Sequence, residues 1–191
     1  MTTKTGCLLN GGDGAVPPDV DGLTETVADL LRARGWTADI QAVRTRRVQP
    51  CNGCFACWVA TPGICIIDDA GRDIARRVAQ SDLAVFVTPV TFGGYSSVLK
   101  NAVDRLIPLI LPYFKRINGE VHHVPRYERY PRLLAVGVTE EGCEDAKDVF
   151  RRVVERNSIN LHSPKYAACF VHPTDENRDA ILSAAIEEVL G

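Results

Sequence analysis

A short apolar run followed by a proline, two glycines and a helical pattern constrains the fold of this chain more than any other stretch. Residues 83–87 are apolar and rich in valine, which is typical of a strand buried on both faces. Pro89 ends this run, Gly93-Gly94 allows a turn, and Ser96-Ser97 offers a cap for the helix that follows. A buried strand that leads into a loop and a helix is half of a βαβ unit. Because such sheets bind ligands beyond the carboxyl ends of their strands, we expect a ligand at residues 89–97.

Strands and helices alternate along the rest of the chain. The apolar patterns predict five strands, each followed by a helix, at residues 5–9, 37–43, 83–87, 133–138 and 167–171. This alternation indicates an α/β fold with a parallel sheet and helices on both faces. With 191 residues, we expect one domain over 1–191. Residues 113–132 have no clean period and are interpreted as a hairpin, a lid over the ligand, or a dimer contact.

The string TPVTFGGYSSVLKNAVDR, residues 88–105, resembles the signature of the NAD(P)H-dependent FMN reductase family. The matching positions are Pro89, Phe92, Gly93, Ser96, Ser97, Leu99, Lys100, Asp104 and Arg105. The resemblance implies a flavodoxin-like fold with strand order 2-1-3-4-5 and FMN as cofactor. It also implies an oxidoreductase that takes electrons from NAD(P)H and reduces a small acceptor, with the flavin carrying the chemistry and no catalytic side chain expected.

Three loops at strand ends are expected to hold FMN, the first beside the phosphate and the other two around the isoalloxazine. The predicted residues are Asn10, Gly11, Gly12, Asp13, Gly14, Thr24, Pro89, Val90, Thr91, Phe92, Gly93, Ser97, Thr139, Glu140, Glu141 and Gly142. The first loop lacks the serine and arginine of the family pattern and carries carboxylates instead. Because carboxylates oppose a phosphate unless they point away, a surface loop that binds nothing is an equally good interpretation of this stretch.

Four of the seven cysteines lie within residues 51–65, CNGCFACWVATPGIC. The odd total and the clustering favour metal or redox chemistry in a reducing compartment over a disulfide framework. Thiolates at such spacing can converge on one metal or cluster. The motif resembles that of the iron-sulfur flavoproteins, which implies a [4Fe-4S] cluster on Cys51, Cys54, Cys57 and Cys65. A redox or packing loop without a cluster and a four-cysteine zinc site remain open. We expect this loop near the flavin, within its own subunit or across a dimer contact.

The overall composition excludes some partners and leaves several functions open. A net charge of −2 gives no indication of a nucleic-acid partner, and no apolar stretch is long enough to span a membrane. No signal peptide is visible, so a cytoplasmic location is expected. The family resemblance implies a homodimer or homotetramer. The alternative functions are an electron carrier between proteins, a plain FMN reductase without a cluster, and a non-catalytic homologue that has lost flavin binding.

Overall fold

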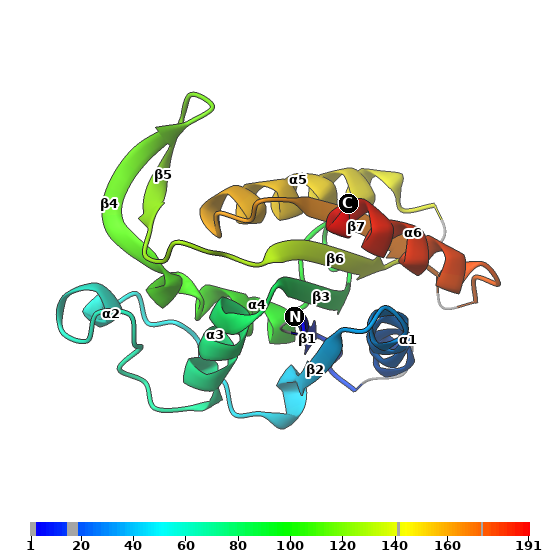
Figure 1. The fold of residues 1–191 in the computed structure, drawn as a ribbon, viewed down its shortest axis with the longest axis horizontal. Helices are drawn as coiled ribbons and strands as arrows, with labels where there is room; N and C mark the ends of the chain where they lie inside the picture. Colours follow the sequence, from blue (N-terminus) through cyan, green and yellow to red (C-terminus); the bar gives the residue numbers. More distant parts are fainter. Residues whose placement is uncertain (1–2, 15–18, 141, 173) are drawn as a thin grey trace.

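A computed structural model describes residues 3–14, 19–140, 142–172 and 174–191 of the chain (Figure 1). Its main sheet has five parallel strands in the order β2-β1-β3-β6-β7. The strands are Thr5–Asn10 (β1), Thr37–Ala42 (β2), Leu83–Pro89 (β3), Arg132–Val138 (β6) and Tyr166–Val171 (β7). Because β6 and β7 are the fourth and fifth strands of this sheet, the predicted flavodoxin-like fold with order 2-1-3-4-5 is confirmed.

Helices cover both faces of the sheet (Figure 1). One layer contains α1 (Val20–Ala33) and α6 (Arg178–Leu190), and the other contains α3 (Ala70–Gln80), α4 (Ser97–Asp104) and α5 (Glu144–Asn160). The shorter helices are η1 (Val43–Thr45), α2 (Ala56–Val59) and η2 (Ile107–Leu109). The side chains of successive strand residues point to opposite faces of the sheet. The central strand β3 is buried on both of its faces, since each face is covered by a helix layer. Val85 and Val87 pack in the first layer, whereas Ala84 and Phe86 pack in the second.

Side-chain oxygens fix the starts of three helices. Asp19 accepts a hydrogen bond from the Gly22 amide at α1, and Asp69 accepts one from the Gly71 amide at α3. At α4, Ser96 accepts a hydrogen bond from the Leu99 amide over 3.1 Å. Each cap satisfies a helix N–H that has no partner within its own helix. The α4 cap places residues 89–96 directly before the helix, as the sequence predicts.

An antiparallel hairpin lies between α4 and β6. It consists of β4 (Ile110–Ile117) and β5 (Glu120–Pro125), joined by a turn in which Asn118 and Gly119 both have positive φ. Asn-Gly is the favoured pair for such two-residue turns. The hairpin confirms one of the interpretations of residues 113–132. Figure 1 shows it projecting on the side where β6 begins, away from the carboxyl ends of the strands. It therefore does not cover the predicted flavin loops of its own chain.

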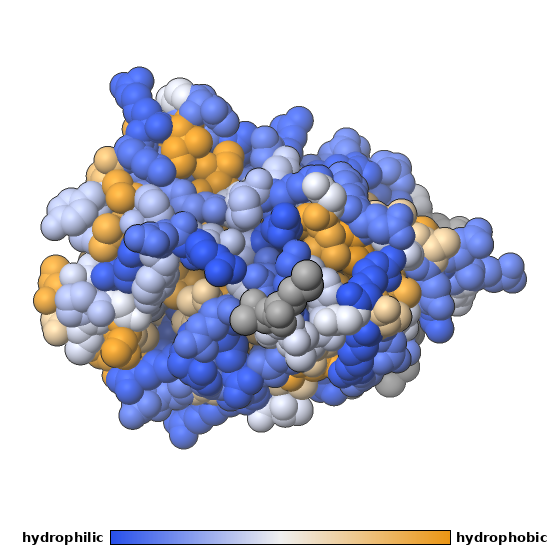
Figure 2. All heavy atoms as spheres, viewed as in Figure 1, coloured by the Kyte–Doolittle hydropathy of each residue, from blue (hydrophilic) through white to orange (hydrophobic). Residues whose placement is uncertain are grey.

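The hairpin carries exposed apolar side chains. Tyr113 and Phe114 on β4 and Val121 on β5 are largely exposed. Figure 2 shows hydrophobic groups gathered over this part of the molecule among hydrophilic neighbours. Within the described ranges, no helix has both the length and the apolar character needed to cross a membrane.

Candidate functional site

The loop after β1 is held by hydrogen bonds within the chain. The Asn10 side chain accepts a hydrogen bond from the Gly12 amide over 2.9 Å and donates one to Asp21 over 2.6 Å. The Gly11 amide donates to the Val87 carbonyl on β3 over 2.8 Å. Asn10 is buried, so its side chain shapes the loop from inside. Two of the amides predicted to face a phosphate, those of Gly11 and Gly12, already have partners.

A cation that the sequence analysis did not assign lies beside this loop. Arg44, on η1, donates to both carboxylate oxygens of Asp21, over 2.7 and 2.6 Å. The Arg44 hydrogen bond is the main cause that lowers the pKa of Asp21. A Cβ placed on Gly14 would lie 3.3 Å from both Cδ and Nε of Arg44, so the arginine side chain packs against the loop. A phosphate bound at this loop would therefore lie near the Arg44 guanidinium, which η1 supplies directly after β2.

The two predicted hydroxyl ligands on helices differ in their surroundings. Thr24 is buried, and its Oγ1 donates to the Val20 carbonyl one turn earlier in α1 over 2.6 Å. The structure does not support a role for Thr24 in holding the cofactor, because its hydroxyl hydrogen is already used. Ser97 is exposed at the first turn of α4. Its neighbour Ser96 makes the contact with the first loop, where its Oγ donates to the Gly11 carbonyl over 2.6 Å.

The loop after β3 contains a tight turn. Thr91 and Gly94 exchange two backbone hydrogen bonds of 3.0 and 2.8 Å, and the two residues between them, Phe92 and Gly93, have φ of 49° and 76°. The left-handed backbone costs a non-glycine residue roughly 1–2 kcal/mol, and such strain clusters at functional sites. The Phe92 side chain is fully exposed at the carboxyl edge of the sheet. The turn thus presents an exposed aromatic ring at the edge of the sheet where the flavin is predicted to bind.

Gly93 forms the turn that the sequence predicts, and its missing side chain also serves packing within the chain. A Cβ at this position would lie 2.7 Å from both Cβ and Cγ1 of Val149 on α5. Its lack of a side chain allows the turn to pack against α5 of the same chain, and its positive φ is a second reason for glycine at this position.

The remaining predicted loop lies next to the turn. Pro89 on β3 is paired with Val138 on β6, and the Val90 amide donates to the Val138 carbonyl over 2.9 Å. Thr139 and Glu140 follow directly, the first buried and the second exposed. Gly142 has a φ of 75°, whereas Glu141 lies outside the described residues. The fold thus brings residues 89–93 together with Thr139 and Glu140 at one edge of the sheet.

The four cysteines of residues 51–65 line one small cavity of about 60 Å³. Cys57 is buried, Cys65 is half-buried, and Cys51 and Cys54 are exposed. Burial raises the pKa of the Cys57 thiol, and the neighbouring Cys65, Cys51 and Cys54 raise it further. A positive centre in the cavity would remove that repulsion, and soft thiolates suit zinc and iron-sulfur centres. As they stand, no three His, Cys, Asp or Glu side chains of the described chain are grouped closely enough to hold a single metal ion.

A buried ion pair joins both ends of the cysteine segment to α4. Arg105, directly after α4, donates to both oxygens of Asp69 over 2.8 and 2.9 Å, and the two side chains are only 1% and 4% exposed. It also donates to the carbonyls of Gln49 and Ile67, which flank the four cysteines. Burial alone raises the pKa of Asp69, but hydrogen bonds from Arg105 and from the Gln49 and Gly71 amides outweigh it and lower the pKa. We call this group the Arg105 clamp.

The Arg105 side chain also borders the four-cysteine cavity. Burial lowers its pKa, but Asp69 and then Cys65 outweigh this effect and raise it. Its buried Nε–H has no hydrogen-bond partner within the described chain. An anionic group in the cavity would therefore find a buried positive charge beside it.

The cysteine segment lies away from the predicted flavin loops of the same chain. The flavin loops adjoin the start of α4 through the Ser96–Gly11 contact, whereas the Arg105 clamp lies after its last turn. The eight residues of α4 separate the two regions by about 12 Å along the helix axis. The segment is anchored there by Trp58, whose indole N–H donates to the Ile110 carbonyl over 2.9 Å. The structure thus separates the cysteines from the predicted flavin loops of the same chain, and of the two expected arrangements it favours the one across a dimer contact.

Comparison with known families shows which family this chain belongs to. The model of the NADPH-dependent FMN reductase family matches residues 20–154. The chain belongs to this family. The matched range includes β3, the turn at Phe92, α4 and the cysteine segment, and it begins after the loop that follows β1. The matched range therefore contains residues 89–93 and the start of the loop after β6, and it leaves out residues 10–14, where this chain departs from the expected pattern.

Individual proteins are similar to part of this sequence or to its fold. An iron-sulfur flavoprotein of Archaeoglobus fulgidus is 29% identical over 83 residues, which cover 44% of this chain and 40% of that protein. The matched stretch thus spans about two fifths of the relative's length. A NAD(P)H:quinone oxidoreductase from Methanothermobacter marburgensis has a TM-score of 0.68 at 12% identity, with 97% of each chain covered. An FMN-dependent NADH-azoreductase from Bacillus anthracis, in complex with FMN, has a TM-score of 0.67 at 12% identity over 98% of this chain and all of that one.

Proposed function

We propose that this protein is an FMN-dependent oxidoreductase that takes electrons from NAD(P)H and reduces a small acceptor, with an iron-sulfur cluster on its cysteine segment. The observation that carries this proposal is the family match over residues 20–154 together with four cysteines that line one cavity. When bound, FMN supplies two-electron chemistry with nicotinamide, and a cluster supplies one-electron transfer. The protein contributes binding, orientation and electrostatics.

The residues at the isoalloxazine end fit a flavin. Residues 89–93 adjoin Thr139 and Glu140, and the strained turn presents the exposed ring of Phe92 beside them. At the phosphate end, Arg44 is a donor that fits an FMN phosphate. It takes the place of the loop hydroxyls expected from the family pattern. Arg44 would compensate the phosphate charge, while Asp21 holds its guanidinium in position.

The residues around the four-cysteine cavity fit an iron-sulfur cluster. The donor set consists of four thiols, which is the usual ligand set for such clusters. The unpartnered Nε–H of Arg105 gives the cavity a buried hydrogen-bond donor, and Phe55, Ile67 and Ile107 give it an apolar wall. Hydrogen bonds to sulfur and exclusion of water are the two means by which a protein tunes a cluster's potential.

We also propose a homodimer or homotetramer. The separation of the cysteine segment from the flavin loops by the length of α4 supports this proposal, because a neighbouring subunit would bring the two closer together than they are within one chain. The exposed Tyr113, Phe114 and Val121 on the hairpin are the apolar surface that such an interface would cover. Light scattering at micromolar concentration tests this proposal. A monomeric mass would contradict it.

Iron, acid-labile sulfide and flavin analysis of anaerobically purified protein tests the cofactors. We expect one FMN and about four irons per chain, with iron lost in Cys54→Ala and retained in Cys143→Ala, whose cysteine lies outside the segment. FMN without iron would leave a plain FMN reductase. Protein that takes up no FMN would contradict the oxidoreductase proposal and favour a non-catalytic homologue. Stopped-flow mixing with NADPH separates the enzyme from an electron carrier, which would be reduced only slowly.

A further inference from the structure

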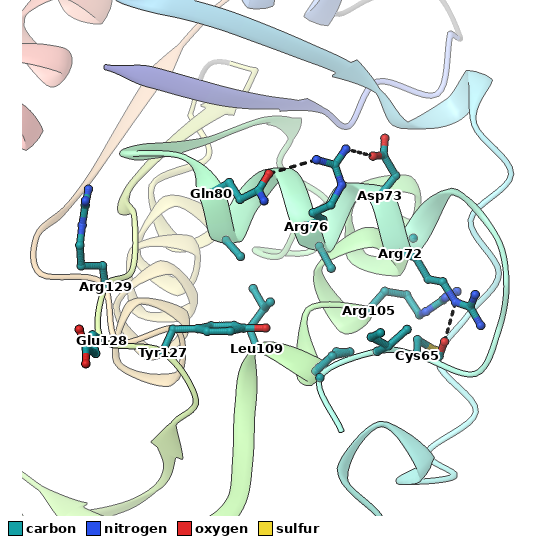
Figure 3. Close-up of a pocket in the computed structure, with 16 residues that line it drawn as sticks. Cys65, Arg72, Asp73, Arg76, Gln80, Arg105, Leu109, Tyr127, Glu128 and Arg129 are labelled. Carbon is teal, nitrogen blue, oxygen red and sulfur yellow. Dashed lines mark hydrogen bonds and ion pairs between the residues drawn. The ribbon is translucent and has the colours of Figure 1, made fainter. Parts of the chain in front are cut away.

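A large cavity lies on the outer side of α3, away from the predicted flavin loops (Figure 3). Its volume is about 740 Å³, within the range of small-molecule sites. It is enclosed by α3, the end of the cysteine segment, η2 and the segment 127–129. We propose that this cavity binds a planar aromatic ligand that carries an anionic group. This inference goes beyond the proposed function and does not depend on it.

One stripe of α3 forms a wall of the cavity. Arg72, Ala75, Arg76 and Ala79 line it, and their spacing of three, four and seven residues places them on one side of the helix. The small side chains of Ala75 and Ala79 form an apolar floor beside the arginines. Leu109 on η2 extends this floor. The result is an apolar surface that suits the face of a ring system.

An aromatic side chain closes the opposite side. Tyr127 lines the cavity, and Figure 3 shows its ring extending toward Leu109. The ring lies 6.2 Å from that of Tyr130, centroid to centroid, and the Tyr130 hydroxyl accepts a hydrogen bond from the Arg126 amide over 2.7 Å. The segment that carries Tyr127 is therefore fixed by its own contacts. A planar ligand between Tyr127 and the alanines of α3 would have an aromatic contact and an apolar one.

Guanidinium groups in the lining offer donors to an anion. Among the described residues that line the cavity are four arginines, Arg72, Arg76, Arg105 and Arg129, and two carboxylates, Asp73 and Glu128. Arg105 and Arg72 are paired with Asp69 and Asp68, so the donors for a ligand come from Arg76 and Arg129. Figure 3 shows Arg129 at one end of the cavity, beside Glu128 and Tyr127, and Arg72 and Arg105 at the other end, with the Arg76 guanidinium turned toward Asp73 and Gln80 on its own helix. Arg76 bonds Asp73 and Gln80 along its own helix, and Arg129, largely exposed, bonds Asp82. Since a guanidinium has five N–H donors, both arginines retain donors for a carboxylate.

The cavity shares Cys65 and Arg105 with the four-cysteine cavity and shares no residue with the predicted flavin loops. A ligand here would lie beside the cysteine segment and apart from the flavin. The site is thus a second small-molecule site on the chain.

Fluorescence titration of the full chain with anthracene-2-carboxylate tests the proposal, with anthracene-2-carboxamide as the uncharged counterpart. We expect saturable binding of one carboxylate per chain and at least about ten-fold weaker binding of the amide, since one charge-assisted hydrogen bond is worth that factor or more. Arg76→Gln and Arg129→Gln should each weaken carboxylate binding by a similar factor. Ala79→Leu should abolish it by filling the floor. Arg32→Gln is the matched control and should leave binding unchanged. Arg32 forms an exposed ion pair with Asp29 at the same helical spacing as Arg76 with Asp73.

Saturation of the chain with FMN should not change the affinity for the carboxylate. The proposal is overturned by equal affinity for the amide, by unchanged binding in Ala79→Leu that folds as the wild type does, or by release of the probe when one equivalent of FMN is added. Absence of saturable binding also overturns it.

Discussion

Replacing Arg105 by methionine should destabilise the chain more than any exposed charge change. The substitution keeps an unbranched apolar stem and removes the guanidinium, which donates to Asp69 and to the carbonyls of Gln49 and Ile67. Asp69 would then keep a buried carboxylate without its charge partner. Breaking a buried ion pair in this way costs about 3–5 kcal/mol, and the almost complete burial of both side chains leaves little solvent screening to reduce it.

Urea denaturation of the cofactor-free chain at neutral pH, followed by circular dichroism, measures this loss. For a chain of this size the same loss lowers Tm by about 6–20 °C. Arg32→Met is the control, because the Arg32–Asp29 pair is exposed and is worth at most about 1 kcal/mol. The cysteine segment should also become a preferred site of proteolysis, since the clamp ties its two ends to α4.

The loss should depend on pH. The pKa of Asp69 is lower in the folded chain than in the unfolded chain. Its contribution to stability is therefore complete above the unfolded pKa of about 3.9 and is lost as the pH falls through the lower folded value. The difference between wild type and Arg105→Met should be largest near neutral pH and should shrink in acid. A loss at neutral pH no larger than that of Arg32→Met would refute the reasoning.

Three further predictions concern individual contacts. Arg44→Gln should weaken FMN binding about ten-fold or more and leave riboflavin binding nearly unchanged, because only FMN has a phosphate; equal losses in the two titrations would contradict this role. Gly93→Val should lower the free energy of unfolding by at least about 1 kcal/mol through its clash with Val149 and its positive φ, and Val149→Ala should restore part of the loss in urea titrations. Trp58→Phe should free the cysteine segment from Ile110 and increase its hydrogen exchange without changing exchange in β3.

Features encoded by local patterns could be predicted from the sequence. The apolar run before Pro89 gives β3, and the serine before an apolar helical period gives the cap of α4, because both depend on neighbours within a few residues. The strand order followed from a resemblance carried by residues 88–105. The hairpin had a local signal in Asn118-Gly119, which the sequence analysis did not use.

Contacts between distant residues could not be predicted. Arg44 reaches Asp21 across 23 positions and Arg105 reaches Asp69 across 36, and no period in the sequence encodes either pair. The role of Gly93 depends on Val149, which the fold brings from another helix. The path of residues 43–69 over the surface depends on Trp58 and the Arg105 clamp, so the position of the cysteines relative to the flavin loops followed only from the structure.

The visible absorption spectrum of anaerobically purified protein, recorded before and after addition of NADPH, tests the central claim most directly. Before the addition, we expect the two bands of an oxidised flavin on the broad absorption of an iron-sulfur cluster. NADPH should bleach the flavin bands in proportion to the protein present. A protein that shows no flavin bands after incubation with FMN, or whose flavin bands are unchanged by NADPH and NADH, would contradict the assignment as an FMN-dependent oxidoreductase.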